Sequence, residues 1–277
     1  MLRASSICLW LGAFVFESGV FCQTYVGIIL GNRWTVPTSI NAQGEIVGYS
    51  SNNIGGAEFG FVRAADGTIT GLPEPPGSAG AGMTAFSINA AGAITGYAPF
   101  FTGISSEGTP VLINRGYVRD PEGNFATFDP PGSISTIPLS INAGGAITGY
   151  YYESNLVLHG FVREPNGRIT SFDPPDSTST KAVSINANGT ITGYYQVADV
   201  SVHGFVRRPR GEIVSFDPPG STGTIVTGIN KAGAITGYYT VANVRSFGFV
   251  RRPEGIFETF DVPGTLVTVL PQIAGFW

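Results

Sequence analysis

Five copies of one motif occupy most of this chain and constrain its fold more than any other feature. The motif is Ser-Ile-Asn-Ala-x-Gly-x-Ile-Thr-Gly-Tyr, then Gly-Phe-Val-Arg, a Pro/Gly turn and Ser/Thr-Phe-Asp-Pro-Pro-Gly, with small variations between copies. Its asparagine recurs at Asn41, Asn89, Asn142, Asn186 and Asn230, and the last three are 44 residues apart. A period of roughly 40–50 residues with several short strands per unit is typical of propellers and solenoids. The residues of the repeat therefore explain the fold first, and a functional site has to be found in addition to them.

One copy of the motif predicts four antiparallel strands. In the fourth copy, segments 182–185, 190–196, 203–207 and 212–217 are rich in β-branched and aromatic residues. Asn-Ala-Asn-Gly and Pro-Arg-Gly turns separate the first from the second and the third from the fourth of these segments. Pro218 and Pro219 end the last strand, because proline cannot donate to a ladder. Four short antiparallel strands per unit indicate an all-β fold, a β-propeller of four-stranded blades.

The number of blades is less constrained than the blade itself. Five units are complete, and segment 265–277 resembles the first two strands of a sixth, to which segment 25–30 is able to add an outer strand. Joining the two chain ends in this way removes exposed sheet edges. We therefore expect six blades, the sixth composite or incomplete. Five blades are the alternative, and an open β-solenoid is the third choice.

Composition and the N-terminus bound the functional class. A net charge of −4 with only 12% charged residues argues against a nucleic-acid surface, which needs a basic stripe. Residues 1–22 have the short basic start and the apolar stretch of a secretory signal peptide, followed by a single repeat domain over 23–277. Cleavage there removes Cys8 and Cys22, leaving no thiol ligand and no disulfide. We expect a secreted or periplasmic bacterial monomer, without stable membrane insertion and without a cofactor.

Tyrosines are the first candidate binding residues. The first tyrosine of each second strand, represented by Tyr150 and Tyr194, is expected in the sheet core. The following tyrosines point to the opposite side and are candidates for stacking on a sugar; they are Tyr151, Tyr195 and Tyr239.

Pairs of histidine and aspartate are a second candidate site. Pairing of the third and fourth strands places His159 near Asp173 and His203 near Asp217. Only two copies carry the histidine, and a catalytic pair would be needed once. We therefore interpret these pairs as ties between strands or blades, with ligand contacts as the alternative. No catalytic residue and no metal-binding residue is predicted.

One loop departs from the repeat. The segment from Gly96 to Gly116 is about nine residues longer than its equivalents and contains Phe100, Phe101 and Glu107. Variable loops on a rigid scaffold often carry function, so this is the best candidate for a specialised segment. The alternative is an insertion tolerated at a loop tip.

The motif resembles the HAF-type extracellular repeat of bacteria. The resemblance is carried by Ser184 to Tyr195, His203 to Phe205 and Phe216 to Gly220, and it extends over nearly the whole chain after the leader. The triplet His-Gly-Phe is present in only two copies. Membership of this family implies secretion and a propeller-like strand pattern. It implies no enzyme activity, cofactor or catalytic residue.

Three functions compete at this point. The first is a secreted scaffold that binds an extracellular polysaccharide or a cell-surface protein through repeated weak sites. The second is a structural extracellular protein. The third is a glycan hydrolase or lyase, which needs two carboxylates about 5–9 Å apart. The acids unique to one copy are scattered, and no Ser-His-Asp order, metal spacing or phosphate loop is present, so the binding scaffold is preferred.

Overall fold

The computed structural model describes residues 34–51, 56–242 and 245–261. Twenty strands form five antiparallel sheets of four, each built from consecutive strands. The strands are β1 (Trp34–Ile40), β2 (Ile46–Ser51), β3 (Glu58–Arg63), β4 (Ile69–Gly71), β5 (Thr84–Ile88), β6 (Ile94–Ile104), β7 (Pro110–Arg119), β8 (Phe125–Phe128), β9 (Ser135–Ile141), β10 (Ile147–Tyr152), β11 (Leu158–Arg163), β12 (Ile169–Phe172), β13 (Ser177–Ile185), β14 (Ile191–Val197), β15 (Val202–Arg207), β16 (Ile213–Phe216), β17 (Gly223–Ile229), β18 (Ile235–Val241), β19 (Arg245–Arg251) and β20 (Phe257–Phe260).

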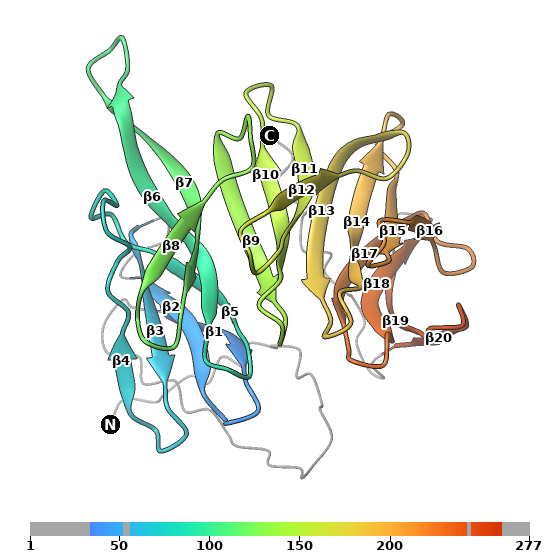
Figure 1. Ribbon diagram of the computed structural model, residues 1–277. Coiled ribbons are helices and arrows are strands. Elements are labelled where there is room, and N and C mark those ends of the chain that lie inside the picture. The colour runs from blue at the N-terminus through green and yellow to red at the C-terminus, as the bar shows by residue number, and fades with distance from the viewer. Residues whose placement is uncertain (1–33, 52–55, 243–244, 262–277) are drawn as a thin grey trace, which may run out of the picture.

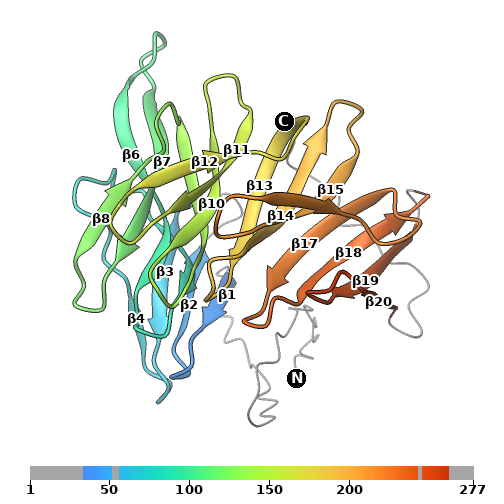
Figure 2. The same ribbon diagram turned by 45° about the vertical axis from the view of Figure 1, so that its right-hand side comes forward.

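Each sheet is one blade of a β-propeller, as the repeat predicts. Successive blades stand side by side around a common axis (Figures 1 and 2), with the first strand of each blade packed against the first strand of the next. This radial arrangement excludes the open solenoid. The described residues form five blades, the alternative count. The composite sixth unit expected from 25–30 and 265–277 lies outside the described residues.

The core lies between blades rather than within one. Phe161, Phe205 and Phe249 are fully buried on the third strands of their blades. Each meets the Phe of the Phe-Asp-Pro motif in the preceding blade, with ring centroids 6.0–6.2 Å apart. Edge-to-face aromatic pairs of this kind contribute roughly 0.5–1.5 kcal/mol beyond the area they bury. Repetition of the motif thus repeats the interface between blades.

The repeated asparagine joins neighbouring blades. In the fourth blade, Asn186 Oδ1 accepts the backbone N–H groups of Asn188 and Thr190 and so closes the first hairpin. Its Nδ2 donates to Asn230 O in the next blade at 3.2 Å. The same side-chain donation, over 3.1–3.4 Å, runs from Asn41 to Asn89 and from there through each following asparagine. Because the amide has both a donor and an acceptor, one residue type fixes the turn and the blade spacing together.

The repeated arginine also contacts the preceding blade. The guanidinium carbons of Arg163, Arg207 and Arg251 lie 4.7–5.0 Å from the ring centroids of phenylalanines in the blade before. Arg163 Nη1 also donates to the carbonyl of Glu164 at 3.3 Å. Burial lowers the pKa of these three arginines, which is the cost of placing them at the interface. These three arginines therefore join each blade to the one before it.

A bulge in the innermost strand of each blade positions the residues around the axis. In β13 the register shifts between Ala182 and Ser184, which leaves Val183 as an extra residue. Gly193 lies opposite this point, and a Cβ there would fall on the carbonyl oxygen of Lys181. The strand glycine therefore permits close approach of two strands of one blade. Bulges re-aim side chains, and the bulged residues of three blades, Leu139, Val183 and Thr227, line one cavity.

No helix in the described ranges has the length and apolar character needed to cross a bilayer.

Candidate functional site

A cavity of about 380 Å³ lies beside the innermost strands of the third, fourth and fifth blades. The bulged residues Leu139, Val183 and Thr227 contribute to its lining. Three tyrosines, one from the second strand of each blade, line it as well; they are Tyr150, Tyr194 and Tyr238. A concave, largely apolar site with a few convergent polar groups is the usual form of a small-ligand site.

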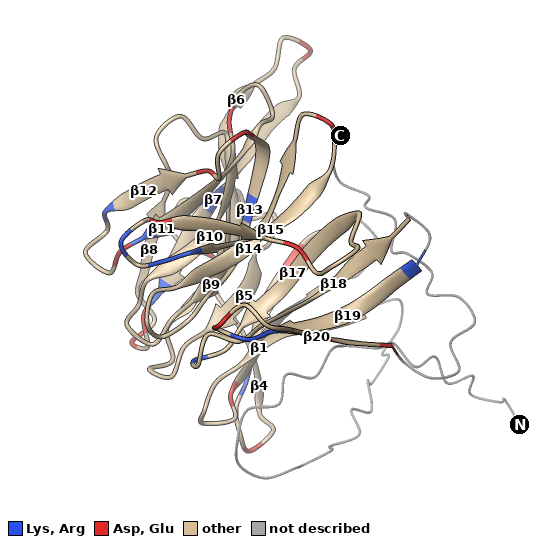
Figure 3. Ribbon diagram, turned by 90° about the vertical axis from the view of Figure 1, so that its right-hand side faces the viewer, with Lys and Arg blue, Asp and Glu red and all other residues tan. Residues whose placement is uncertain are grey.

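Lys181 of β13 is the charged residue of this lining. Its Nζ lies 5.3 Å from the ring centroid of Tyr150, within the range of a cation–π interaction. Burial lowers the pKa of Lys181. In contrast, charged residues elsewhere are found mainly in turns and at strand ends (Figure 3). The cavity therefore combines one ammonium group with aromatic surfaces.

The tyrosine hydroxyls of the cavity are protonated donors. Burial raises the pKa of Tyr194 to about 12, with smaller contributions from Tyr238 and Tyr152. Burial also raises the pKa of Tyr150 and Tyr238. A phenol that keeps its proton is able both to donate and to accept a hydrogen bond, as a sugar hydroxyl requires.

The adjacent tyrosines are in a different environment. Tyr151, Tyr195 and Tyr239 are only 4–7% exposed and belong to the hydrophobic clusters between blades. The hydroxyl of Tyr195 bonds to Ser215 Oγ at 2.8 Å. These rings have no open face for a sugar, because the preceding blade covers them. The expected roles of the two tyrosine sets are thus corrected: the second set forms core, and three members of the first, Tyr150, Tyr194 and Tyr238, line the cavity.

The predicted histidine–aspartate pairs are present. His159 Nδ1 lies 2.7 Å from Asp173 Oδ2, and His203 Nδ1 lies 2.7 Å from Asp217 Oδ2. The second and fifth blades have Arg–Asp ion pairs at this level instead, Arg115–Asp129 and Arg245–Asp261, each at 2.5 Å.

In two of these four pairs the aspartate reaches the next blade as well. Asp217 Oδ1 accepts from Thr224 Oγ1 at 2.5 Å, and Asp129 Oδ1 accepts from Thr136 Oγ1 at 2.6 Å. Both threonines are fully buried. The geometry favours our interpretation of these pairs as ties between strands and blades.

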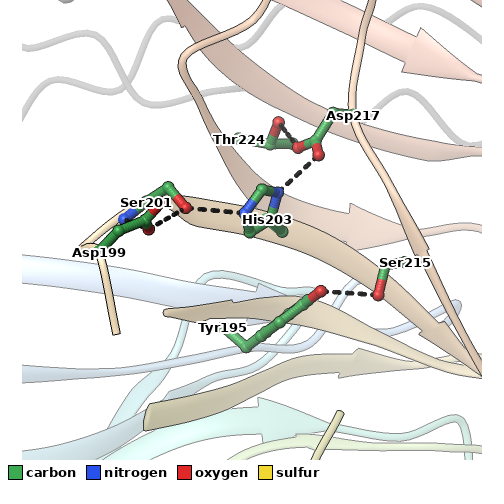
Figure 4. A network of polar contacts seen from close by, with 7 residues as sticks. All are labelled: Tyr195, Asp199, Ser201, His203, Ser215, Asp217 and Thr224. Atoms are coloured by element: carbon green, nitrogen blue, oxygen red, sulfur yellow. Dashed lines mark hydrogen bonds and ion pairs between the residues drawn. The ribbon is translucent and has the colours of Figure 1, made fainter. Parts of the chain in front are cut away.

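The fourth blade extends its pair into a longer network (Figure 4). Ser201 Oγ lies 2.9 Å from His203 Nε2 and 2.6 Å from Asp199 Oδ1. The spacing Asp217–His203–Ser201 is that of a hydrolytic triad, but Ser201 has one proton and Asp199 competes for it. Hydrogen bonds from Ser201 lower the pKa of Asp199, as donation to that carboxylate requires. The proton of Ser201 is therefore shared between two acceptors, the carboxylate of Asp199 and the imidazole of His203.

The third blade provides an internal comparison for this network. Val157 occupies the place of Ser201, and His159 Nε2 lies 3.8 Å from Glu153. Both loops have the same shape, with Leu156 and Val200 at φ of 63° and 64°. The serine is therefore dispensable for the loop conformation. Within the described ranges, no group of three or more His, Cys, Asp or Glu has the proximity to hold a metal ion.

The long segment of the second blade is a hairpin rather than an irregular loop. Strands β6 and β7 continue to Ile104 and Pro110, so that the hairpin rises above its neighbours (Figure 1). Phe100 is buried under Arg115, whose guanidinium carbon lies 5.3 Å from the ring centroid. Phe101 is 55% exposed. Glu107 lies in the exposed turn at the tip and is not among the described residues that line the cavity.

Lys181 was missed by the sequence reasoning, although a signal was available. The chain has two lysines, Lys181 and Lys231. Lys181 lies opposite Tyr194, at the place where the other blades have Val, Thr or Ile. Since four blades form with an uncharged residue at this position, the fold does not require a lysine there. Recognising it needs the register of the bulged strand, which the motif alone does not give.

Solved structures with a similar fold were found. A prolyl endopeptidase aligns over 83% of this chain and 36% of its own, with a TM-score of 0.59 and 16% identity. TolB from Acinetobacter baumannii aligns over 81% of this chain and 53% of its own, with a TM-score of 0.53 and 14% identity. A fungal lectin from Aleuria aurantia, a six-bladed β-propeller that recognises fucose, aligns over 81% and 76% with a TM-score of 0.44 and 16% identity.

The likenesses to the endopeptidase and to TolB show a shared fold alone. The chain spans about a third of the endopeptidase and about half of TolB, so neither protein is matched as a whole. No protein-family model matches the sequence, and no curated protein sequence matches it significantly. The resemblance to the HAF-type repeat therefore stays a prediction.

Proposed function

We propose that this protein is a carbohydrate-binding propeller that acts outside the cytoplasm, with the tyrosine-lined cavity as its binding site. One observation carries the proposal: three tyrosines from three blades, Tyr150, Tyr194 and Tyr238, meet on one cavity of about 380 Å³. Aromatic rings with a polar end suit sugars, which present apolar C–H faces and hydroxyl edges. The predicted secretory leader, outside the described residues, supports the location.

Binding is favoured over hydrolysis by the same lining. Glycoside hydrolysis uses a pair of carboxylates on either side of the scissile bond. Among the described residues that line the cavity there is no carboxylate. Ser201, which belongs to the polar network of the fourth blade, donates its hydroxyl proton to the carboxylate of Asp199. The arrangement supports recognition of a glycan without turnover.

The test is binding of the purified protein to an array of bacterial and plant oligosaccharides. We expect saturable binding to one glycan class, and a loss of at least about fivefold in affinity for Tyr150→Ala and for Tyr238→Ala. Phe101→Ala is the matched control, since Phe101 is an exposed aromatic on the long hairpin. A blank array with a cooperatively folded protein overturns the proposal. Loss of binding in Phe101→Ala alone moves the site to the hairpin.

A further inference from the structure

The lining of the cavity has two levels along the innermost strands. At the first level stand the three tyrosines, each paired across its blade with a residue of the innermost strand. Two residues further along that strand comes the bulged residue of the same blade, which defines the second level; these residues are Leu139, Val183 and Thr227. At roughly 3.3 Å per residue, the two levels are separated by about the width of a pyranose ring.

The tyrosine level offers hydroxyl groups that the protein does not use. Within the described ranges, the hydroxyls of Tyr150, Tyr194 and Tyr238 form no hydrogen bond with the protein. Tyrosines elsewhere do find partners, since Tyr117 donates to the carbonyl of Thr84 at 3.1 Å and Tyr195 bonds to a serine. Each unused phenol is able both to donate and to accept, so this level suits the hydroxyl groups of a ligand.

The bulge level is apolar. Leu139 and Val183 present aliphatic side chains there. The hydroxyl of Thr227 lies 3.2 Å from the carbonyl oxygen of Thr236 and 3.0 Å from its hydroxyl, so it is used within its own blade. A ligand hydroxyl at this level would lose its water without gaining a partner, whereas a methyl group would gain apolar contacts.

Resting on the proposed function, we infer that the sugar bound in this cavity is a 6-deoxyhexose. Its ring hydroxyls meet the phenols at the first level, and its methyl group lies against Leu139 and Val183 at the second. The corresponding hexose carries one more hydroxyl, on C6, which would be placed among these aliphatic side chains. The inference requires no charge on the ligand, and the ammonium group of Lys181 already lies against the ring of Tyr150.

The experiment compares sugars that differ only in the hydroxyl on C6. The methyl glycosides of L-fucose and L-galactose form one pair, and those of L-rhamnose and L-mannose form the second. Each is titrated calorimetrically into the purified protein. We expect binding of at least one deoxy member, and affinity lower by about ten- to a hundredfold for its hydroxylated counterpart, because the site leaves that hydroxyl unpaired.

Val183→Thr tests the placement of the methyl group. This substitution keeps the shape of the side chain and adds a hydroxyl at the apolar level, so it should reduce the preference for the deoxy member by at least about threefold. Val214→Thr is the matched control, because Val214 is 39% exposed on β16 and is not among the residues that line the cavity. It should keep the full preference. Circular dichroism and thermal unfolding establish that each variant is folded.

The outcomes separate this inference from the proposed function. Equal affinities within each pair, or tighter binding of the hydroxylated member, overturn the inference while the proposed function stands. Saturable binding on the glycan array without binding of either deoxy sugar has the same meaning. A preference that Val183→Thr leaves unchanged also overturns the inference, because the methyl group then lies elsewhere. A blank array together with no binding of any of the four sugars overturns both.

Discussion

Two adjacent tyrosines of one strand, Tyr194 and Tyr195, are used in opposite ways. Tyr194 lines the cavity, and burial raises its pKa to about 12. Tyr195 is 7% exposed, bonds to Ser215 and packs with Phe205 between two blades. Successive side chains of a strand point to opposite faces, so a Tyr-Tyr pair places one ring on each face of the blade. One repeat thus contributes to an interface between blades and to the lining of the cavity at the same time.

The largest expected effect is on the interface side of this pair. Replacement of Tyr195 by alanine leaves a cavity among Phe205, Ile185 and Ile191 and removes the bond to Ser215. We expect a loss of about 3–5 kcal/mol in the free energy of unfolding, as for other large aromatic residues of a core. Urea unfolding followed by circular dichroism measures it. A cost below that of Tyr194→Ala would contradict the assignment of the two faces.

The cavity side should respond in binding more than in stability. Tyr194→Ala removes a ring from the cavity lining and should lower glycan affinity by about five- to tenfold, the strength of one aromatic contact. Tyr194→Phe keeps the ring and should retain most of the affinity. Tyr195→Phe is the control on the other face, with unchanged binding and a loss of roughly 1 kcal/mol of stability from the missing hydrogen bond. Calorimetric titration separates these variants.

The pH dependence of unfolding at alkaline pH provides a further test of the buried environment of Tyr194. The pKa of Tyr194 is about 12 in the folded chain and about 10 in the unfolded chain, so between these values the folded state holds the proton more strongly. Its contribution to stability is complete below pH 10 and is lost as the pH rises toward 12. Tyr194→Phe should therefore show a shallower decline of stability over pH 10–12. Equal slopes in the two proteins would contradict the buried environment of the hydroxyl.

Lys181 acts with the opposite sign and needs a control. Its pKa is lowered from 10.5, so the unfolded chain binds more protons just below that value, and stability rises with pH there. Carrying out the comparison in a Lys181→Met background removes this opposing slope. The difference that Tyr194→Phe still makes in this background then reports the phenol.

The sequence predicts the blade but not its orientation. Periodic turns, Phe-Asp-Pro motifs and strand lengths determine four strands per unit, and pairing across the third hairpin predicts the bond between His203 and Asp217. The alternation in Tyr194-Tyr195 shows that the rings diverge, yet both faces of a blade are covered in a propeller, one by the preceding blade and one by the following blade. Which is which depends on the bulge at Val183, a register shift that no residue type announces. Because of the same register shift, the motif alone does not predict that Lys181 lines the cavity.

The smallest effect on stability is expected for His203, whose ring packs against that of Tyr195. His203 lies over Tyr195 with ring centroids 5.5 Å apart, and Phe247 occupies the equivalent place over Tyr239 at the same distance. His203→Phe therefore keeps the ring contact and loses a half-exposed bond to Asp217, which is worth about 0–1 kcal/mol. Asp217 keeps its bond from Thr224. Thermal unfolding should place this variant within a few degrees of the parent protein.

The reciprocal replacement distinguishes the two partners. Asp217→Ala leaves the buried hydroxyl of Thr224 without that acceptor, a cost of about 1–3 kcal/mol, so it should destabilise the protein more than His203→Phe. The reverse order would mean that the histidine, with Ser201 and Asp199, has a role beyond tying the blade together. In that case the fourth blade would differ in function from the third, where Val157 replaces the serine, and Ser201→Val would reproduce the effect. If the order is as expected, the specialised chemistry of this propeller lies at the axis, where the repeat is broken by one lysine.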